Sequence, residues 1–143
     1  MAERRELLLV ECTAALDDIR KTLQDVNSFL STCPIPQSRV RDLDLVLAEV
    51  MTNIARHGYP EKPGMISLRL DQTAHMLECR VADHGESFDH TLLGSTPPDP
   101  CNLPEGGYGW YIIRSIARQI RYERMEGENI LLFSVPVDNS ECA

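Results

Sequence analysis

The sequence lacks the marks of a membrane, secreted or disulfide-stapled protein. No apolar run approaches the roughly 20 residues that cross a bilayer. The first residues, MAERRELLLVEC, offer neither a signal-peptide apolar region of adequate length nor a small-residue cleavage site. The five cysteines are odd in number and include no C-x-x-C pair, which argues against a disulfide framework and a zinc site. We therefore expect a soluble cytoplasmic protein with reduced thiols and no membrane partner.

Basic residues are also in short supply. The chain has 14 lysines and arginines against 22 aspartates and glutamates, which gives a formal net charge of -8. A chain with this balance repels nucleic acid and anionic membrane surfaces. The expected partners are therefore proteins or small molecules, without direct contact to nucleic acid.

What is present is the composition of a single globular domain, spanning residues 1–143. Hydrophobic residues make up 43% of the chain and charged residues 25%, and the sequence has no repeat and no low-complexity tract. A chain of this length buries a respectable core without covalent staples.

The first part of the chain predicts a strand and two helices. Residues 6–12 are short and apolar enough for a strand, and Thr13 is the predicted cap of the first helix. Spacings of three and four give that helix a core face made of Leu16, Ile19, Leu23, Val26 and Leu30. Two prolines end it, and the second helix begins at Pro36 or two residues later, runs to about His57 and stops at Gly58.

The remainder predicts two hairpins, separated by a long loop and a helix. Apolar residues alternate over 66–70 and 77–81, which is typical of two hairpin-linked strands. Residues 85–107 carry several prolines and little periodicity, which indicates a functional loop or lid. A helix over 109–119 and a terminal hairpin turning at 126–127 follow. The expected fold is an α+β two-layer sandwich with a mixed, largely antiparallel sheet and helices on one face.

The second predicted helix carries a polar stripe beside its core face. At about 100° per residue, Glu49, Asn53 and Arg56 fall next to the apolar residues of the same helix. One interpretation is the solvated flank of an amphipathic helix. The other is a proton acceptor and a metal-binding oxygen placed about one helical turn apart. The helix alone does not decide between them.

A second acid stands at the end of a predicted strand. Asp83 continues the parity of Leu77, Cys79 and Val81, so its carboxylate is expected to point toward the covered face. Burial of a carboxylate is costly unless donors satisfy it. Either Asp83 is a turn acid at an exposed strand end, or it is an acceptor for the amino group of a ligand, with Gly85 allowing a close approach.

Glycines precede the last predicted helix. Gly106, Gly107 and Gly109 stand directly before its apolar residues, and free N–H groups at such a helix start can bind an anion. A flexible loop would have the same composition. The chain has no GxxxxGK[ST] motif, so a phosphate here would be held by backbone amides, a metal ion and an arginine such as Arg56 or Arg114.

Taken together and in this order, these segments resemble the ATP-binding domain shared by gyrase, heat-shock protein 90, histidine kinases and mismatch-repair ATPases. EVMTNIARHGY is similar to the N-box of that superfamily, VADHG to its first glycine box and EGGYGWYIIRSIA to its second, and YERMEGENILLFSV fits the terminal pattern. Within the superfamily, the chain most resembles the anti-sigma-factor serine kinases of bacterial partner-switching systems. The resemblance implies a Bergerat-type ATP-binding fold.

The resemblance also implies roles for individual residues. Glu49 matches the general base, and Asn53 the side chain that coordinates magnesium. Asp83 matches the acceptor of the adenine amino group, and Gly85 the glycine beside the base. The residues that match the phosphate-binding box are Gly106, Gly107 and Gly109. The implied ligands are ATP and magnesium, residues 94–107 are expected to form the ATP lid, and Ser87 departs from the usual glycine or alanine of the first box.

The implied activity is transfer of the ATP γ-phosphate to a serine of a small anti-sigma-factor antagonist of the STAS type. The protein would also sequester a sigma factor or another regulator. The alternative is a nucleotide-binding interaction module without kinase activity, and an isolated ATPase or histidine-kinase fragment is a third reading. Members of this family commonly form homodimers, but the sequence does not fix the oligomeric state or the identity of the partners.

Overall fold

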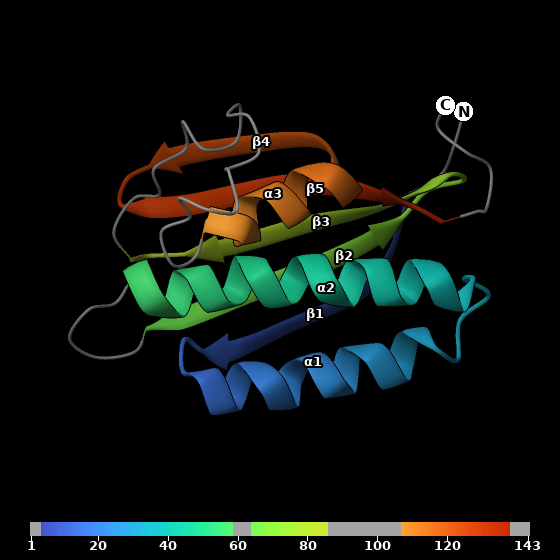
Figure 1. The fold of residues 1–143 in the computed structure, drawn as a ribbon, viewed down its shortest axis with the longest axis horizontal. Coiled ribbons are helices and arrows are strands. Elements are labelled where there is room, and N and C mark those ends of the chain that lie inside the picture. Colours follow the sequence, from blue (N-terminus) through green and yellow to red (C-terminus); the bar gives the residue numbers. More distant parts are fainter. Residues whose placement is uncertain (1–3, 59–63, 86–106, 138–143) are drawn as a thin grey trace.

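The computed structural model describes residues 4–58, 64–85 and 107–137, which form two layers (Figure 1). One layer is a five-stranded sheet with the strand order β1-β2-β3-β5-β4, and the other consists of helices that cover one face of that sheet. The predicted two-layer α+β sandwich is confirmed. Every neighbouring pair among the described strands is antiparallel, so these strands lack the parallel component of the expected mixed sheet.

The bounds of the elements follow the chain. The strands are β1 (Arg5–Thr13), β2 (Met65–Gln72), β3 (Met76–Asp83), β4 (Arg118–Met125) and β5 (Glu128–Pro136). The helices are α1 (Leu16–Leu30), α2 (Gln37–Asn53), a π-helical turn η1 (Ile54–Gly58) and α3 (Gly107–Ile116). No helix in the described ranges is long and apolar enough to cross a membrane.

The start of α1 differs from the prediction. Its N-cap is Ala15, which makes no side-chain capping bond, whereas Thr13 still belongs to β1. The Thr13 hydroxyl donates instead to the carboxylate of Asp18 in the first helical turn. Leu16 is 50% exposed because it borders an open cavity between α1 and α2, so its assignment to the core face was wrong. The other four predicted core residues of α1 are buried.

Helix α2 supplies the centre of the core. Leu43, Leu47 and Val50 are fully buried on the face that the sequence predicted. The α-helix ends at Asn53, and the backbone continues as the π-helical turn to Gly58, so the expected helical span to about His57 is found with a change of winding. A single π-helical turn at a helix end often marks a functional position.

Two hairpins and a bulge complete the sheet. The terminal hairpin turns at Glu126 and Gly127, both with positive φ, as predicted. The predicted helix over 109–119 was too long at its C-terminal end, because Gln119 has φ 53 and the chain has already entered β4 at Arg118. The β4–β5 register shifts between Arg118 and Arg121, which makes a β-bulge at this edge of the sheet.

Candidate functional site

The residues singled out from the sequence gather at one end of the sandwich. The C-terminal end of α2, the first turn of α3, the end of β3 and the start of β5 all lie at the same end of the molecule (Figure 1). Helices α2 and α3 pack against each other, and β3 pairs with β5 so that Asp83 lies opposite Asn129. The fold therefore brings the polar residues of two helices and two strands into one region.

Glu49 and Asn53 face the backbone of α3 at Gly109. A Cβ atom added to Gly109 would lie 2.8 Å from Glu49 Oε2 and 3.5 Å from Asn53 Nδ2. The first of these distances is shorter than any ordinary contact of a Cβ atom. Glycine at this position thus lets α3 approach the acid and the amide of α2 without displacing them.

Asn53 does not lie on a solvated flank. Its side chain is only 6% exposed, and its Nδ2 is a buried atom with no hydrogen-bond partner in the described part of the chain. A buried amide without a partner costs free energy in the isolated protein. Rotation of the amide by half a turn presents the oxygen in place of the nitrogen. The arrangement therefore suits a ligand that offers an acceptor or a cation at this point.

Asp83 is buried at the end of β3, as its parity predicted, with 2% of its surface exposed. Its Oδ1 accepts hydrogen bonds from the backbone N–H of Gly85 at 2.9 Å and from Asn129 Nδ2 at 2.9 Å. Through the hydrogen bond from Gly85, Asp83 stabilises the turn that follows it, although Asp83 is buried and not exposed. Within the described part of the chain, both hydrogen bonds to this carboxylate end on Oδ1, which leaves Oδ2 to accept a donor from outside.

A polar network from β4 and β5 holds this carboxylate and Gly85 in place. Asn129 Nδ2 also donates to the carbonyl oxygen of Gly85 at 3.1 Å, and Arg124 Nη1 donates to the same carbonyl at 3.0 Å. The Oδ1 of Asn129 accepts from Arg124 Nη1 at 2.7 Å and from the Tyr122 hydroxyl. Buried polar networks of this kind fix the orientation of their members.

The sequence analysis missed Asn129 and its partners. Asn129 continues the inward parity of Leu131, Phe133 and Val135 on β5, so the argument that identified Asp83 would have identified it as well. Its position opposite Asp83 could not be predicted, because neither strand's own sequence determines the pairing register between β3 and β5. Arg124 and Tyr122 gave no separate signal.

Several predicted positions lie elsewhere or outside the described residues. Arg56 is exposed and lines a cavity of about 750 Å³ between α1 and α2, so it is not brought to Glu49 and Asn53, and its role stays a prediction. Gly107 begins α3. Gly106, Ser87 and nearly all of the expected lid over 94–107 lie outside the described residues.

Comparison with known proteins decides the family. The model of the histidine kinase-like ATPase domain matches residues 12–135, which is most of the chain. The chain belongs to the histidine kinase-like ATPase domain family.

Several proteins of similar sequence are named serine-protein kinases. The protein named serine-protein kinase RsbW of Bacillus cereus strain AH820 is 34% identical over 99 residues, which is 65% of this chain and 62% of the relative. Its counterpart in Bacillus thuringiensis strain Al Hakam is 33% identical over 101 residues, with the same shares. The chain thus spans less than two thirds of the length of the curated relatives it matches. The histidine kinase AdeS of Acinetobacter baumannii aligns in structure with 12% identity and a TM-score of 0.48, covering 93% of this chain and 70% of that one.

The residues present fit the nucleotide that this family name implies. Among the described residues, Oδ2 of Asp83 has no hydrogen-bond donor and can accept an amino group, and the buried Asn53 amide nitrogen, one helical turn from Glu49, has no partner. Gly109 keeps the backbone of α3 clear of a side chain at the same place. Amide and carboxylate oxygens are ligands that Mg²⁺ accepts, together with phosphate oxygens of its substrate.

Proposed function

We propose that this chain is an ATP-dependent serine protein kinase of a bacterial partner switch. Its protein substrate would be a small anti-sigma-factor antagonist of the STAS type, and the chain would also sequester a sigma factor or another regulator. The observation that carries the proposal is the packing of bare backbone at Gly109 against Glu49 and the unsatisfied amide of Asn53. The names of the relatives support the serine kinase rather than another ATPase.

In this proposal Asp83 selects the base. Its Oδ1 is held by Gly85 N–H and Asn129, so Oδ2 is oriented to accept the amino group of adenine. A guanine base presents a carbonyl oxygen there, which would face a carboxylate oxygen without a proton between them. The site is therefore specific for ATP over GTP.

Glu49 acts on the attacking hydroxyl. Its carboxylate takes the proton as the serine oxygen forms a bond to the γ-phosphorus, and the bond from that phosphorus to the β,γ-bridging oxygen breaks, so that ADP leaves with the electron pair. A magnesium ion held by Asn53 would neutralise phosphate charge. The N–H groups of the first turn of α3, which begins at Gly107, would donate to phosphate oxygens.

Two substitutions on α2 test the proposal, and they differ in kind. Glu49→Gln is expected to leave Mg-ATP affinity nearly intact and to lower phosphotransfer by about two to four orders of magnitude, the usual range for a lost general base. Asn53→Ala is expected to weaken both nucleotide binding and transfer, with a smaller affinity loss when magnesium is omitted, because a ligand to the metal also holds the ground-state complex. Transfer is measured with labelled ATP, magnesium and a STAS-type antagonist, followed by mapping of the phosphorylated residue.

The alternative is an interaction module that binds nucleotide and partners without transferring phosphate. In that case the native chain binds ATP and the regulator, no phosphoserine forms on the antagonist, and Glu49→Gln changes nothing. Native-rate transfer by Glu49→Gln would remove Glu49 from the role of base. Regulator binding should survive Glu49→Gln in either case, which makes it the folding control.

A further inference from the structure

The face of the sheet that the helices leave open carries a concentration of arginines. A cavity of about 510 Å³ on this face is lined by four arginines and two carboxylates, together with Cys79, Gln119, Leu132, Phe133 and Ser134. The arginines are Arg4, Arg69, Arg80 and Arg121. This local excess of positive charge stands out in a chain whose formal net charge is -8.

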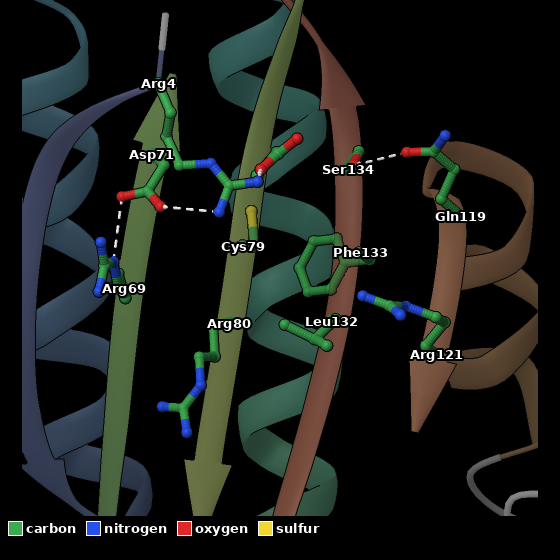
Figure 2. Close-up of a pocket in the computed structure, with 11 residues that line it drawn as sticks. Arg4, Arg69, Asp71, Cys79, Arg80, Gln119, Arg121, Leu132, Phe133 and Ser134 are labelled. Carbon is green, nitrogen blue, oxygen red and sulfur yellow. Dashed lines mark hydrogen bonds and ion pairs between the residues drawn. The ribbon is translucent and has the colours of Figure 1, made fainter. Parts of the chain in front are cut away.

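Three of these arginines form a row across the strands, which we call the arginine row: Arg69, Arg80 and Arg121. Arg69 of β2 is the cross-strand partner of Arg80 of β3, and Arg80 and Arg121 are both partners of Leu132 on β5 (Figure 2). Like charges directly opposite each other destabilise a sheet. The row therefore has a cost in the isolated chain that an anionic partner would remove.

The arginines of this face differ in what they already bind. Arg69 Nε lies 3.1 Å from Asp71 Oδ1 and 3.6 Å from Glu6 Oε1, and Arg4 is paired with Glu78 and with Asp71. Arg80 and Arg121 have no ion pair or hydrogen bond to any described residue, and their guanidinium groups extend over the open face in Figure 2. Two charge-assisted donors are thus available on either side of Leu132.

The bulge in β4 shapes this surface. Gln119 has φ 53, and its amide oxygen accepts a hydrogen bond from the Ser134 hydroxyl at 3.2 Å, while the register shift sets Arg121 opposite Leu132. Bulges re-aim side chains in this way, and they also protect an edge strand from further pairing. The result is an apolar strip at Leu132 with a planar donor group on each side.

We propose that the arginine row is a docking surface for an acidic segment of a partner protein. A guanidinium group presents a planar set of donors that matches a carboxylate with two parallel hydrogen bonds. The apolar strip at Leu132 accepts the aliphatic part of such a segment. A long polyanion such as nucleic acid extends beyond the arginine row and is repelled by the net negative charge of the chain. A short acidic segment interacts mainly with the positive charge close to it.

The surface lies on the opposite side of the sheet from the proposed nucleotide site. Arg80 and Asp83 are both on β3, but Asp83 is buried toward the helices, whereas Arg80 lines the open face. Substitutions in the arginine row should therefore leave ATP binding unchanged. Failure of this proposal and failure of the kinase proposal are thus distinguishable.

The test uses a fluorescent peptide of alternating glutamate and leucine, and the same peptide with glutamine in place of glutamate. Anisotropy titrations are expected to show that the chain binds the glutamate peptide at low salt and binds it less as salt rises. The double variant Arg80→Glu/Arg121→Glu should lose roughly tenfold or more in affinity, since two charge-assisted pairs are replaced by repulsion. Arg20→Glu/Arg41→Glu alters two exposed arginines on α1 and α2 and changes the net charge by the same amount, so it is the matched control and should bind as the native chain does.

Other outcomes overturn the proposal. Equal binding of the glutamine peptide means that the face is only apolar. An equal loss of affinity in Arg20→Glu/Arg41→Glu means that only net charge matters. A labelled oligonucleotide that binds through Arg80 and Arg121 while the peptide does not would assign the face to nucleic acid. If the double variant turns a dimer into a monomer in sedimentation and no peptide binds, the face joins two copies of this chain. Arg80→Gln/Arg121→Gln, with native thermal unfolding and ATP binding, separates loss of binding from loss of fold.

Discussion

Asp83 shows how one carboxylate can serve the fold and a ligand at once. Its Oδ1 is occupied by Gly85 N–H and by Asn129, which fixes the plane of the group and the direction of Oδ2. The residue that orients the acid lies on another strand, 46 positions further along the chain. Base recognition in the proposed kinase therefore depends on the β3–β5 pairing as much as on Asp83 itself.

Asp83→Asn is expected to weaken ATP and ADP binding together, by about tenfold to a hundredfold. If the amide oxygen keeps the two internal donors, the amide nitrogen must face the amino group of adenine, and two donors then stand opposed. Calorimetry with ATP and GTP is the measurement, and the native chain should bind GTP poorly. Asp71→Asn changes a buried carboxylate on the other face of the sheet and should leave both affinities unchanged. Equal native affinity for ATP and GTP would contradict this assignment.

Asn129→Leu removes the donor that holds Asp83 without touching the base directly. We expect ATP affinity to fall less than in Asp83→Asn, because the acid remains but is oriented by Gly85 alone. In the double variant the two losses should not add, since Asn129 acts through Asp83. A double-mutant cycle of ATP affinities measures this coupling. Additive losses would show that Asn129 contributes only to the stability of the sheet.

At the scale of elements, the close packing of α3 on α2 depends on the glycine at position 109, which has no side chain. Gly109→Ala would place a methyl group 2.8 Å from Glu49 Oε2, and the long side chain of Glu49 can yield by a small rotation. The fold should tolerate this, because alanine is the better helix former by about 1 kcal/mol. Phosphotransfer should nevertheless fall by roughly tenfold to a hundredfold, since a small misplacement of a reacting group is costly.

Gly127→Ala is the matched control for this prediction. Gly127 has φ +80 and no atom within 4 Å of an added Cβ, so alanine there introduces backbone strain but no contact. It should lower the free energy of unfolding by about 1–2 kcal/mol and leave transfer at the native rate. Kinetics and urea unfolding of both variants give the two readouts. If both variants lose activity in proportion to stability, the Gly109 contact has no special role.

Elements were predictable from the sequence where periodicity was long, and their ends were not. The core face of α2 and the terminal turn at Glu126 and Gly127 follow from local residues alone. The start of α1 did not, because Thr13 pairs with Met65 in the sheet and so is unavailable as a cap. The predicted end of α3 was also wrong, because the α-helix stops at Ile116, β4 begins at Arg118, and Gln119 has φ 53 at the bulge.

The sequence predicted which acids and amides of the candidate site face inward, but not which residues they contact. Parity on β3 gave Asp83, and the helical stripe gave Glu49 and Asn53. Their proximity to Gly109, and the link from Asp83 to Asn129, depend on helix packing and strand register. Those are set by the whole core, so a reading of separate segments cannot supply them.

At the scale of the whole molecule, the buried thiol of Cys79 links stability to alkaline pH. Burial raises the pKa of Cys79 well above its ordinary value of 9.0, and Glu78 and Asp71 raise it further. Above pH 9.0 the unfolded chain loses this proton while the folded chain keeps it. The contribution to stability is therefore fully present below pH 9.0 and is lost as the pH rises toward the folded pKa.

The expected result is a free energy of unfolding that falls with rising pH above this value, with Cys79 contributing about 1.4 kcal/mol per pH unit. Cys79→Val keeps the core filled and removes the titrating group, so its profile should be flatter than that of the native chain by this amount. Urea unfolding at several alkaline pH values measures both profiles. Parallel profiles would mean that the thiol of Cys79 does not carry the effect.

The alternation of β3 constrains where this chain can gain or lose residues. Asp83 and Asn129 project toward the helices, while Arg80 lies three residues before Asp83 and projects from the other face. One residue inserted between them would turn one of these side chains to the wrong face, because the side-chain period of a strand is two. Insertions at Glu126 and Gly127 would lengthen a turn without changing either face. Sequences that keep both surfaces should therefore vary in length at the hairpin turns and keep a constant number of residues between Arg80 and Asp83.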